Sequence, residues 1–105
     1  MSTAMEVVLG EWEAQAEHLR ELHWINGKLI DDNGTMLDIL EADANDHTLL
    51  LAYGGPTAVL APDPLARRST FMLTVSYGDA EHSEPVVLPK IDGYIIEHMG
   101  LGFHQ

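Results

Sequence analysis

The chain has 105 residues, 46% of them hydrophobic, which predicts a single globular domain spanning 1–105 and excludes disordered and collagen-like architectures. It contains no cysteine, which excludes disulfides, thiolate metal sites and cysteine nucleophiles. Seventeen acidic residues against five basic ones give a net charge of −12. This charge disfavours direct binding to nucleic acid or to an anionic membrane, because both ligands require a basic surface.

The first predicted element is an amphipathic helix from residue 3 to about residue 21. Thr3 and Glu6 have the spacing of a capping box, in which each side chain binds the other residue's backbone N–H. Apolar residues recur at helical spacing and predict the buried face: Met5, Val8, Trp12, Ala16 and Leu19, flanked by Leu9 and Leu22. Four glutamates lie on a different face: Glu6, Glu13, Glu17 and Glu21.

Turn signals dominate the next segment. Asn26-Gly27 favours a two-residue hairpin turn between 22–25 and 28–31, because both residues accept positive φ. Alternatively, Gly27 is the residue just past a longer helix; we favour the hairpin. A second turn is predicted at 32–34. A strand is expected over 35–41, with Leu37 and Ile39 on one face, and a polar connection over 42–46.

The middle of the chain alternates between strand and turn patterns. The continuous apolar run from His47 to Tyr53 is typical of a central strand covered on both faces. Gly54-Gly55-Pro56 interrupts it, strand character resumes over 57–60, and a loop follows from Pro62 through Arg67-Arg68. The alternation of Phe71, Leu73, Val75 and Tyr77 with more polar residues gives the clearest strand, over 70–77.

The C-terminal part is predicted as a loop over 78–85, a short edge strand over 85–88 and a short helix within 89–100. Ile91, Ile95 and Met99 fit the apolar stripe of this helix, although Tyr94-Ile95-Ile96 also favours a strand. The predicted fold class is therefore α+β: an N-terminal amphipathic helix packed on a mostly antiparallel meander sheet of about five strands, with a short C-terminal helix.

Motifs for catalysis and cofactor binding are missing from the sequence. The six histidines lack the spacing of a zinc site, and an EF-hand alignment on Gly34 places Leu29 and Leu40 where acidic ligands are required. Gly54-Gly55 lacks the Lys and Ser/Thr of a phosphate-binding loop. We therefore expect neither an enzyme, nor a cofactor, nor a metal site. Arg67-Arg68 is expected either to grip an anion or to balance nearby acids in a loop.

Charge is the one unusual feature. Residues 1–52 contain eleven acids and two bases, whereas residues 53–105 contain six acids and three bases. An acidic surface steers a basic partner toward it, and apolar anchors supply affinity. The predicted partner-binding residues are the acids Glu6, Glu13, Glu17, Glu21, Asp31, Asp32, Asp43 and Asp46 with the anchors Trp24 and Tyr53.

In size, acidity and lack of cysteine, the chain resembles in general character the immunity proteins against nuclease toxins, anti-CRISPR inhibitors and DNA-mimic inhibitors, although no residue motif matches one of these families. This resemblance implies a stoichiometric inhibitor of a basic, nucleic-acid-handling protein. The N-terminus lacks a basic, apolar signal segment, and the longest apolar run is too short to span a bilayer, so a cytoplasmic protein is expected.

Three alternative functions remain open: a small-ligand or metal-binding module, a structural or assembly protein, and an ordinary acidic domain without a specific partner. The sequence predicts no oligomeric state. A small-ligand or metal-binding module would use His98, His104 and Glu97. A structural or assembly protein would use an edge strand or the 100–105 tail, with Leu101 and Phe103. In each of these, as in an ordinary acidic domain, the negative charge would serve only solubility.

Overall fold

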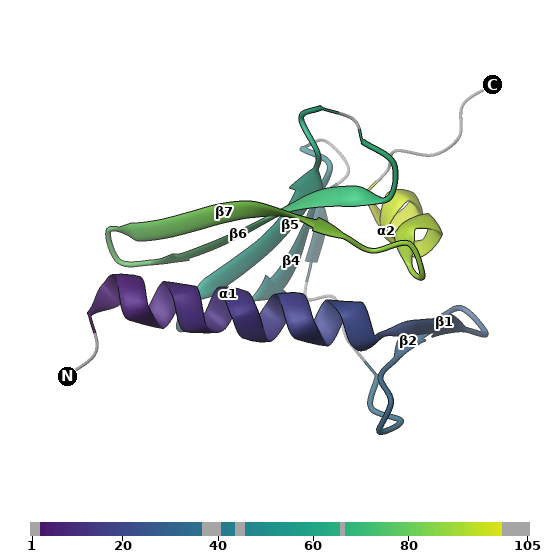
Figure 1. The fold of residues 1–105 in the computed structure, drawn as a ribbon. Helices are drawn as coiled ribbons and strands as arrows, with labels where there is room; N and C mark the ends of the chain where they lie inside the picture. Colours follow the sequence, from purple (N-terminus) through teal and green to yellow (C-terminus); the bar gives the residue numbers. More distant parts are fainter. Residues whose placement is uncertain (1–2, 37–40, 44–45, 66, 100–105) are drawn as a thin grey trace.

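The fold consists of a five-stranded antiparallel meander with a long helix along one face. The computed structural model describes residues 3–36, 41–43, 46–65 and 67–99. The elements are α1 (Ala4–Glu21), β1 (His23–Ile25), β2 (Lys28–Ile30), β3 (Glu41–Asp43), β4 (Thr48–Ala52), β5 (Thr57–Pro62), β6 (Thr70–Tyr77), β7 (Ala80–Val87) and α2 (Asp92–His98). Strands β3 to β7 pair in chain order, and β1 and β2 form a separate hairpin (Figure 1). The predicted α+β class is confirmed.

Helix α1 begins at the predicted capping box. The backbone N–H of Glu6 donates to Thr3 Oγ1 over 3.2 Å, and the backbone N–H of Thr3 donates to Glu6 Oε1 over 3.1 Å. Most of the predicted apolar stripe is buried: Val8, Trp12, Ala16 and Leu19. Met5 was expected in this stripe but is 42% exposed, because it lies in the first turn at the margin of the interface.

The chain then reverses in the predicted hairpin. Asn26 and Gly27 both have positive φ, 51° and 79°, as a two-residue turn of this kind requires, and Ile25 pairs with Lys28. Helix α1 therefore ends at Glu21, and Gly27 is a turn residue and not a helix terminator. The hairpin continues the line of α1 beyond the sheet (Figure 1).

The core lies between α1 and the inner face of the sheet. Leu49, Leu60 and Leu73 stand side by side on three adjacent strands, and all three are buried. Helix α1 packs mainly against β6 and β7 and makes fewer contacts with β5. Trp12 joins the two layers, because its indole Nε1–H donates to the Leu73 carbonyl oxygen over 2.8 Å.

The outer face of the sheet is less covered than the sequence predicts. Leu49 and Leu51 of β4 are buried, but Leu50 between them is partly exposed. The expectation that this strand is covered on both faces is therefore wrong. Its outer-face neighbours on β5 and β6, Val59 and Thr74, are also partly exposed. Among the described residues a helix covers only the inner face.

Two strand predictions need correction. The segment 78–85 was expected to be a loop and 85–88 a short edge strand, yet β7 extends from Ala80 to Val87 and pairs with the whole of β6. The sequence pattern does not indicate this strand, because many of its residues are polar. Polar residues are tolerated there, since glutamate on an edge strand reaches solvent even from the inner face. The turn residues Gly78-Asp79, with Gly78 at φ 60°, close this hairpin.

The polar connection expected over 42–46 is also partly wrong, because Ala42 and Asp43 belong to the edge strand β3 and pair with Leu49 and Thr48. The strand predicted over 35–41 falls largely on residues 37–40, which lie outside the described residues. Its flanks are described: Met36 forms an isolated bridge with Ile30, and β3 begins at Glu41.

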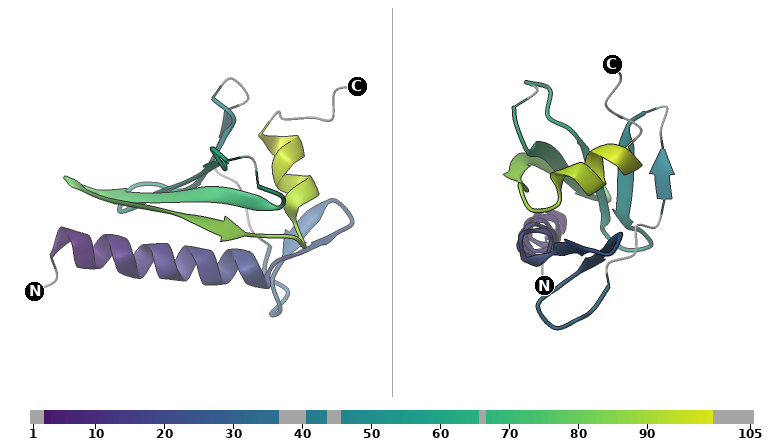
Figure 2. Two further views of the ribbon diagram at one scale, coloured as in Figure 1. Left: turned by 45° about the horizontal axis from the view of Figure 1, so that its top comes forward. Right: turned by 90° about the vertical axis from the view of Figure 1, so that its right-hand side faces the viewer.

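Helix α2 closes the end of the core next to the β1–β2 hairpin (Figure 2). Its predicted stripe of Ile91, Ile95 and Met99 is buried. His47 fixes the helix end to the sheet, because its Nδ1 lies 3.0 Å from the Met99 carbonyl oxygen. The helical prediction for this segment is confirmed, and the strand alternative is wrong.

The two tryptophans allow a matched test of the core. Trp12→Phe removes a buried hydrogen bond and part of a buried ring, so we expect it to lower the free energy of unfolding by about 1–3 kcal/mol. Trp24→Phe, at a half-exposed ring, should cost less than about 1 kcal/mol. Urea denaturation followed by far-UV circular dichroism measures both values. Equal losses would contradict the role of Trp12 as the link between layers.

Candidate functional site

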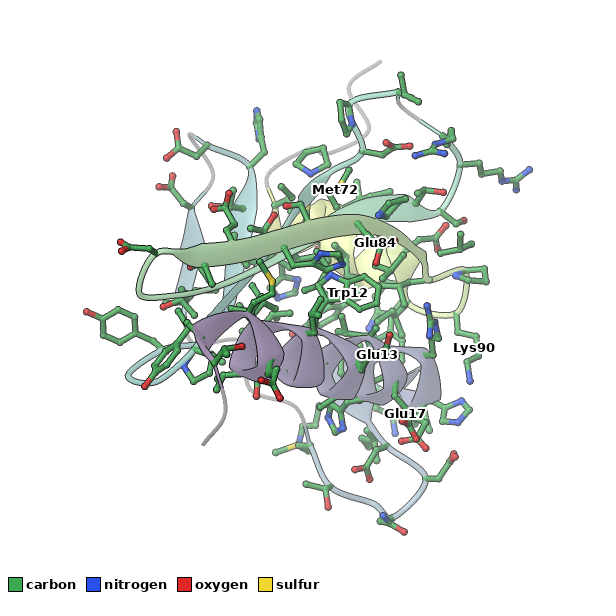
Figure 3. All side chains as sticks on the ribbon, turned by 60° about the vertical axis from the view of Figure 1, so that its left-hand side comes forward. Trp12, Glu13, Glu17, Met72, Glu84 and Lys90 are labelled. Carbon is green, nitrogen blue, oxygen red and sulfur yellow. The ribbon has the colours of Figure 1, made fainter. Side chains whose placement is uncertain are left out.

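The main candidate site is a row of glutamates on α1, hereafter the acidic stripe: Glu6, Glu13, Glu17 and Glu21. At 3.6 residues per turn the four Cα atoms lie within about 80° around the helix axis and extend over about 22 Å. All four side chains are exposed. Figure 3 shows Trp12 between α1 and the sheet, with Glu13 and Glu17 on the open surface of the helix.

Three of the four carboxylates of the stripe are electrostatically uncompensated, whereas Glu6 accepts the backbone N–H of Thr3 in the capping box. Within the described part of the chain, Glu13, Glu17 and Glu21 form neither an ion pair nor a side-chain hydrogen bond. Glu13 and Glu17 are four residues apart, as are Glu17 and Glu21, and like charges at this spacing destabilise a helix by a few tenths of a kcal/mol. Glu21 also stands at the negative end of the helix dipole. The charges of the stripe therefore lower the stability of the helix.

Small and apolar residues accompany the acidic stripe. Gly10 lies within it, and a Cβ built there would have no heavy atom within 4 Å. A mid-helix glycine costs about 1 kcal/mol relative to alanine, and here packing within the chain does not require it. Leu9, 41% exposed, lies next to one border of the stripe, about 40° from Glu13 around the helix axis.

The two acidic residues that follow β2, Asp31 and Asp32, form contacts with nearby residues of the same region. Asp31 folds its own turn, since its Oδ1 accepts the backbone N–H groups of Asn33 and Thr35. Asp32 Oδ1 lies 3.0 Å from His23 Nε2 at the surface. Because β2 runs back toward α1 and Ile30 pairs with His23, Asp31 and Asp32 follow a strand end that lies next to the C-terminal end of the helix.

Trp24, one of the two predicted anchors, packs against α2. Its ring meets Tyr94 edge-on at a centroid distance of 5.9 Å and covers Gly93, where a Cβ would come within 2.9 Å of Trp24 Cζ3. Although 44% of this residue remains exposed, much of its ring therefore holds the β1–β2 hairpin to α2.

Asp43, Asp46 and Tyr53 belong to the β3–β4 and β4–β5 segments and not to α1. Asp43 lines a shallow hollow on the outer face of the sheet with Thr48, Leu50 and Val59, and its Oδ1 accepts the backbone N–H of Asp46. Tyr53, 77% exposed, follows β4 at the turn into β5. The structure thus brings together the four glutamates of α1, whereas Asp43 lies on the edge strand β3, Asp46 in the turn after it and Tyr53 at the turn between β4 and β5.

A pocket of about 290 Å³ between α1 and the β7–α2 connection was missed from the sequence. Its lining is Leu19, Arg20, Val87, Leu88, Pro89, Lys90 and Ile91. The pocket is formed by residues far apart in the chain, so no local sequence pattern predicts it. Two of the five basic residues of the protein line it.

A second polar cluster surrounds Asp63, which is buried after β5. Arg67 Nε donates to Asp63 Oδ2 over 2.7 Å, and the backbone N–H groups of Leu65 and Arg67 donate to the same carboxylate. The Arg67 side chain above all, helped by the two backbone donors and opposed by burial, lowers the pKa of Asp63 to about 2. The same pair raises the pKa of Arg67. Arg67 therefore balances an acid within its own loop.

The histidines take separate structural positions. His82 Nε2 lies 2.6 Å from Glu84 Oε2 and its ring packs edge-on against Trp12. The His98 ring stacks on Tyr94, whereas His104 lies outside the described residues. No group of three His, Asp or Glu side chains within the described ranges could hold a metal ion. Nor is any helix in that part of the chain both long and apolar enough to cross a membrane.

We found no match for this chain among family models, curated proteins or solved structures.

The Asp63–Arg67 pair predicts a specific pH dependence. A lowered pKa means that the ionised carboxylate stabilises the fold above the ordinary value of 3.8, and that this contribution disappears as pH falls through about 2. We expect Asp63→Asn to lower the Tm at neutral pH and the difference from wild type to shrink between pH 4 and pH 2. Thermal melts across that range measure it. A Tm difference independent of pH would contradict an ionic role for Asp63.

Proposed function

We propose that this protein is a stoichiometric inhibitor that binds a basic, nucleic-acid-handling protein partner through the acidic stripe of α1. The observation that carries the proposal is the row of three uncompensated carboxylates, Glu13, Glu17 and Glu21, on a helix whose opposite face is anchored in the core. A nucleic-acid-binding cleft presents cations spaced to meet phosphates. A rigid helix with four carboxylates over about 22 Å offers such a cleft an alternative set of anions.

The distribution of charge supports binding more than solubility alone. Solubility requires net charge, which charges scattered over the surface supply equally well. Within α1, however, Arg20 is the only Lys or Arg among 18 residues, and Glu13, Glu17 and Glu21 are spaced to repel one another. A helix that needed only stability and solubility would gain from Glu–Lys pairs at this spacing.

The surface next to the charges is suited to close contact. Gly10 leaves the helix backbone open to a partner side chain, and Leu9 offers apolar area next to one border of the stripe. Charges chiefly raise the association rate, whereas buried apolar contacts slow dissociation. The stripe and its border together supply both.

Neutralising the stripe tests the proposal. The variant E13Q/E17Q/E21Q keeps the side-chain sizes and removes three charges, and D79N/E81Q/E97Q removes three exposed charges elsewhere. Both proteins, and the wild type, are immobilised and exposed to lysate of the native host at low salt. We expect one basic protein to be retained by the wild type and by the D79N/E81Q/E97Q control, lost from the stripe variant, and released as salt rises.

The retained protein is then purified and mixed with this chain. Its nucleic-acid binding or cleavage should be blocked at a one-to-one ratio, and the stripe variant should associate about tenfold more slowly at low salt with an unchanged or slightly higher Tm. Retention of the same proteins by both variants would show that the stripe is not the interface.

Gly10 provides a second test with opposite effects on stability and binding. Gly10→Ala should raise the free energy of unfolding by about 0.5–1 kcal/mol, because the position is helical and open. Gly10→Trp should leave folding intact but slow or abolish capture of the partner, since the large ring projects from the centre of the stripe. Chemical denaturation and the capture assay measure the two effects. Undiminished capture by Gly10→Trp would exclude contact at the middle of α1.

A further inference from the structure

The pocket between α1 and the β7–α2 connection combines an apolar floor with a cationic rim. Leu19, Leu88 and Ile91 are almost fully buried and form the floor. Arg20 and Lys90 contribute the rim, and Figure 3 shows Lys90 beside the C-terminal half of α1. In a protein with net charge −12, a pocket lined by two cations and no acid is electrostatically exceptional.

The two cations are available to a ligand. Arg67 is bonded to Asp63, but neither Arg20 nor Lys90 forms an ion pair with any residue that the structure describes. Arg20 stays unpaired even though Glu17 lies one helical turn before it. A carboxylate at the mouth of the pocket would find a guanidinium and an ammonium as donors, and charge-assisted hydrogen bonds of this kind are the strong ones.

We propose, building on the protein-binding function above, that this pocket captures the free C-terminus of the partner. An apolar final side chain, such as Phe or Leu, fills the space above Leu19, Leu88 and Ile91. The terminal carboxylate pairs with Arg20 and Lys90, and basic residues that precede it lie along the acidic stripe from Glu17 toward Glu13.

The size and position of the pocket favour a chain terminus. A volume of about 290 Å³ holds one large side chain with its terminal carboxylate, near the lower limit of the sites that enclose whole ligands. Arg20 lies on α1 between Glu17 and Glu21, so cation and anion sites follow one another along the same helix. A basic segment that ends in an apolar residue and a carboxylate presents the complementary order of charges.

A synthetic peptide tests this directly. The probe is a fluorescein-labelled peptide with several Lys and Arg residues and a C-terminal Phe, prepared as the free acid and as the amide. Fluorescence polarisation at low salt should show the free acid binding the wild type about tenfold more tightly than the amide. Replacing the final Phe by Ser should also weaken binding, because the apolar floor is then left unfilled.

The variant R20Q/K90Q gives effects of opposite sign for the two peptides. Removing two cations makes the protein more negative, so the amide should bind as tightly as before or more tightly. The free acid should bind more weakly and lose its advantage over the amide. The matched control K28Q/R68Q, which removes two exposed cations outside the pocket, should preserve that advantage.

The outcomes separate this proposal from the function on which it depends. If acid and amide bind the wild type equally but both weaken in E13Q/E17Q/E21Q, the C-terminal pocket is excluded and the acidic interface stands. If octanoate displaces the free acid, and a peptide lacking Lys and Arg binds as well as the basic one, the pocket is a site for small amphipathic acids and the proposal fails. Absence of binding by the free-acid peptide also overturns the pocket proposal. The lysate capture experiment tests the acidic stripe independently of that result.

Discussion

The structure depends on a single helix burying the inner face of a five-stranded sheet. Trp12 is the central contact, because its ring packs between α1 and β7 while its Nε1–H satisfies a carbonyl oxygen of β6. This contact fixes the rotation of α1 about its axis. With Val8, Trp12, Ala16 and Leu19 directed inward, the glutamates can only face solvent. The position of the candidate interface is thus a direct consequence of how the core is packed.

The rotation of α1 also generates the pocket. Leu19 belongs to the buried stripe, whereas Arg20 lies at its edge, so the last turn of the helix presents an apolar and a cationic residue side by side. The chain that leaves β7 then passes this turn before α2 begins, and brings Val87 and Lys90 to it. Arg67, in contrast, is paired with Asp63 of its own loop, whereas Arg20 and Lys90 form no ion pair within the described residues.

Local patterns account for the features that the sequence predicts correctly. The capping box of Thr3, the turn at Asn26-Gly27, the alternation in β6 and the stripe of α2 each involve residues within a few positions of one another. β7 escaped prediction because its pairing with β6 overrides its polar composition. The acids of α1 could be assigned to one face from spacing alone, but the position of Asp43 at the opposite edge of the sheet from β7 depends on the order of strands, which helical and strand periodicities do not encode.

The placement of the few cations makes the charge pattern informative. Any arrangement of seventeen acids and five bases would give the same net charge. Acidic helix faces are common where neighbouring lysines or arginines balance them. Here Arg20 is the one Lys or Arg of α1. It lines a pocket with Lys90 and forms no ion pair with its helical neighbours Glu17 and Glu21. Intramolecular pairing would stabilise the helix by a few tenths of a kcal/mol. Instead, unpaired charges of both signs lie next to one another on α1. A complementary partner must carry an anion opposite Arg20 and cations opposite the glutamates.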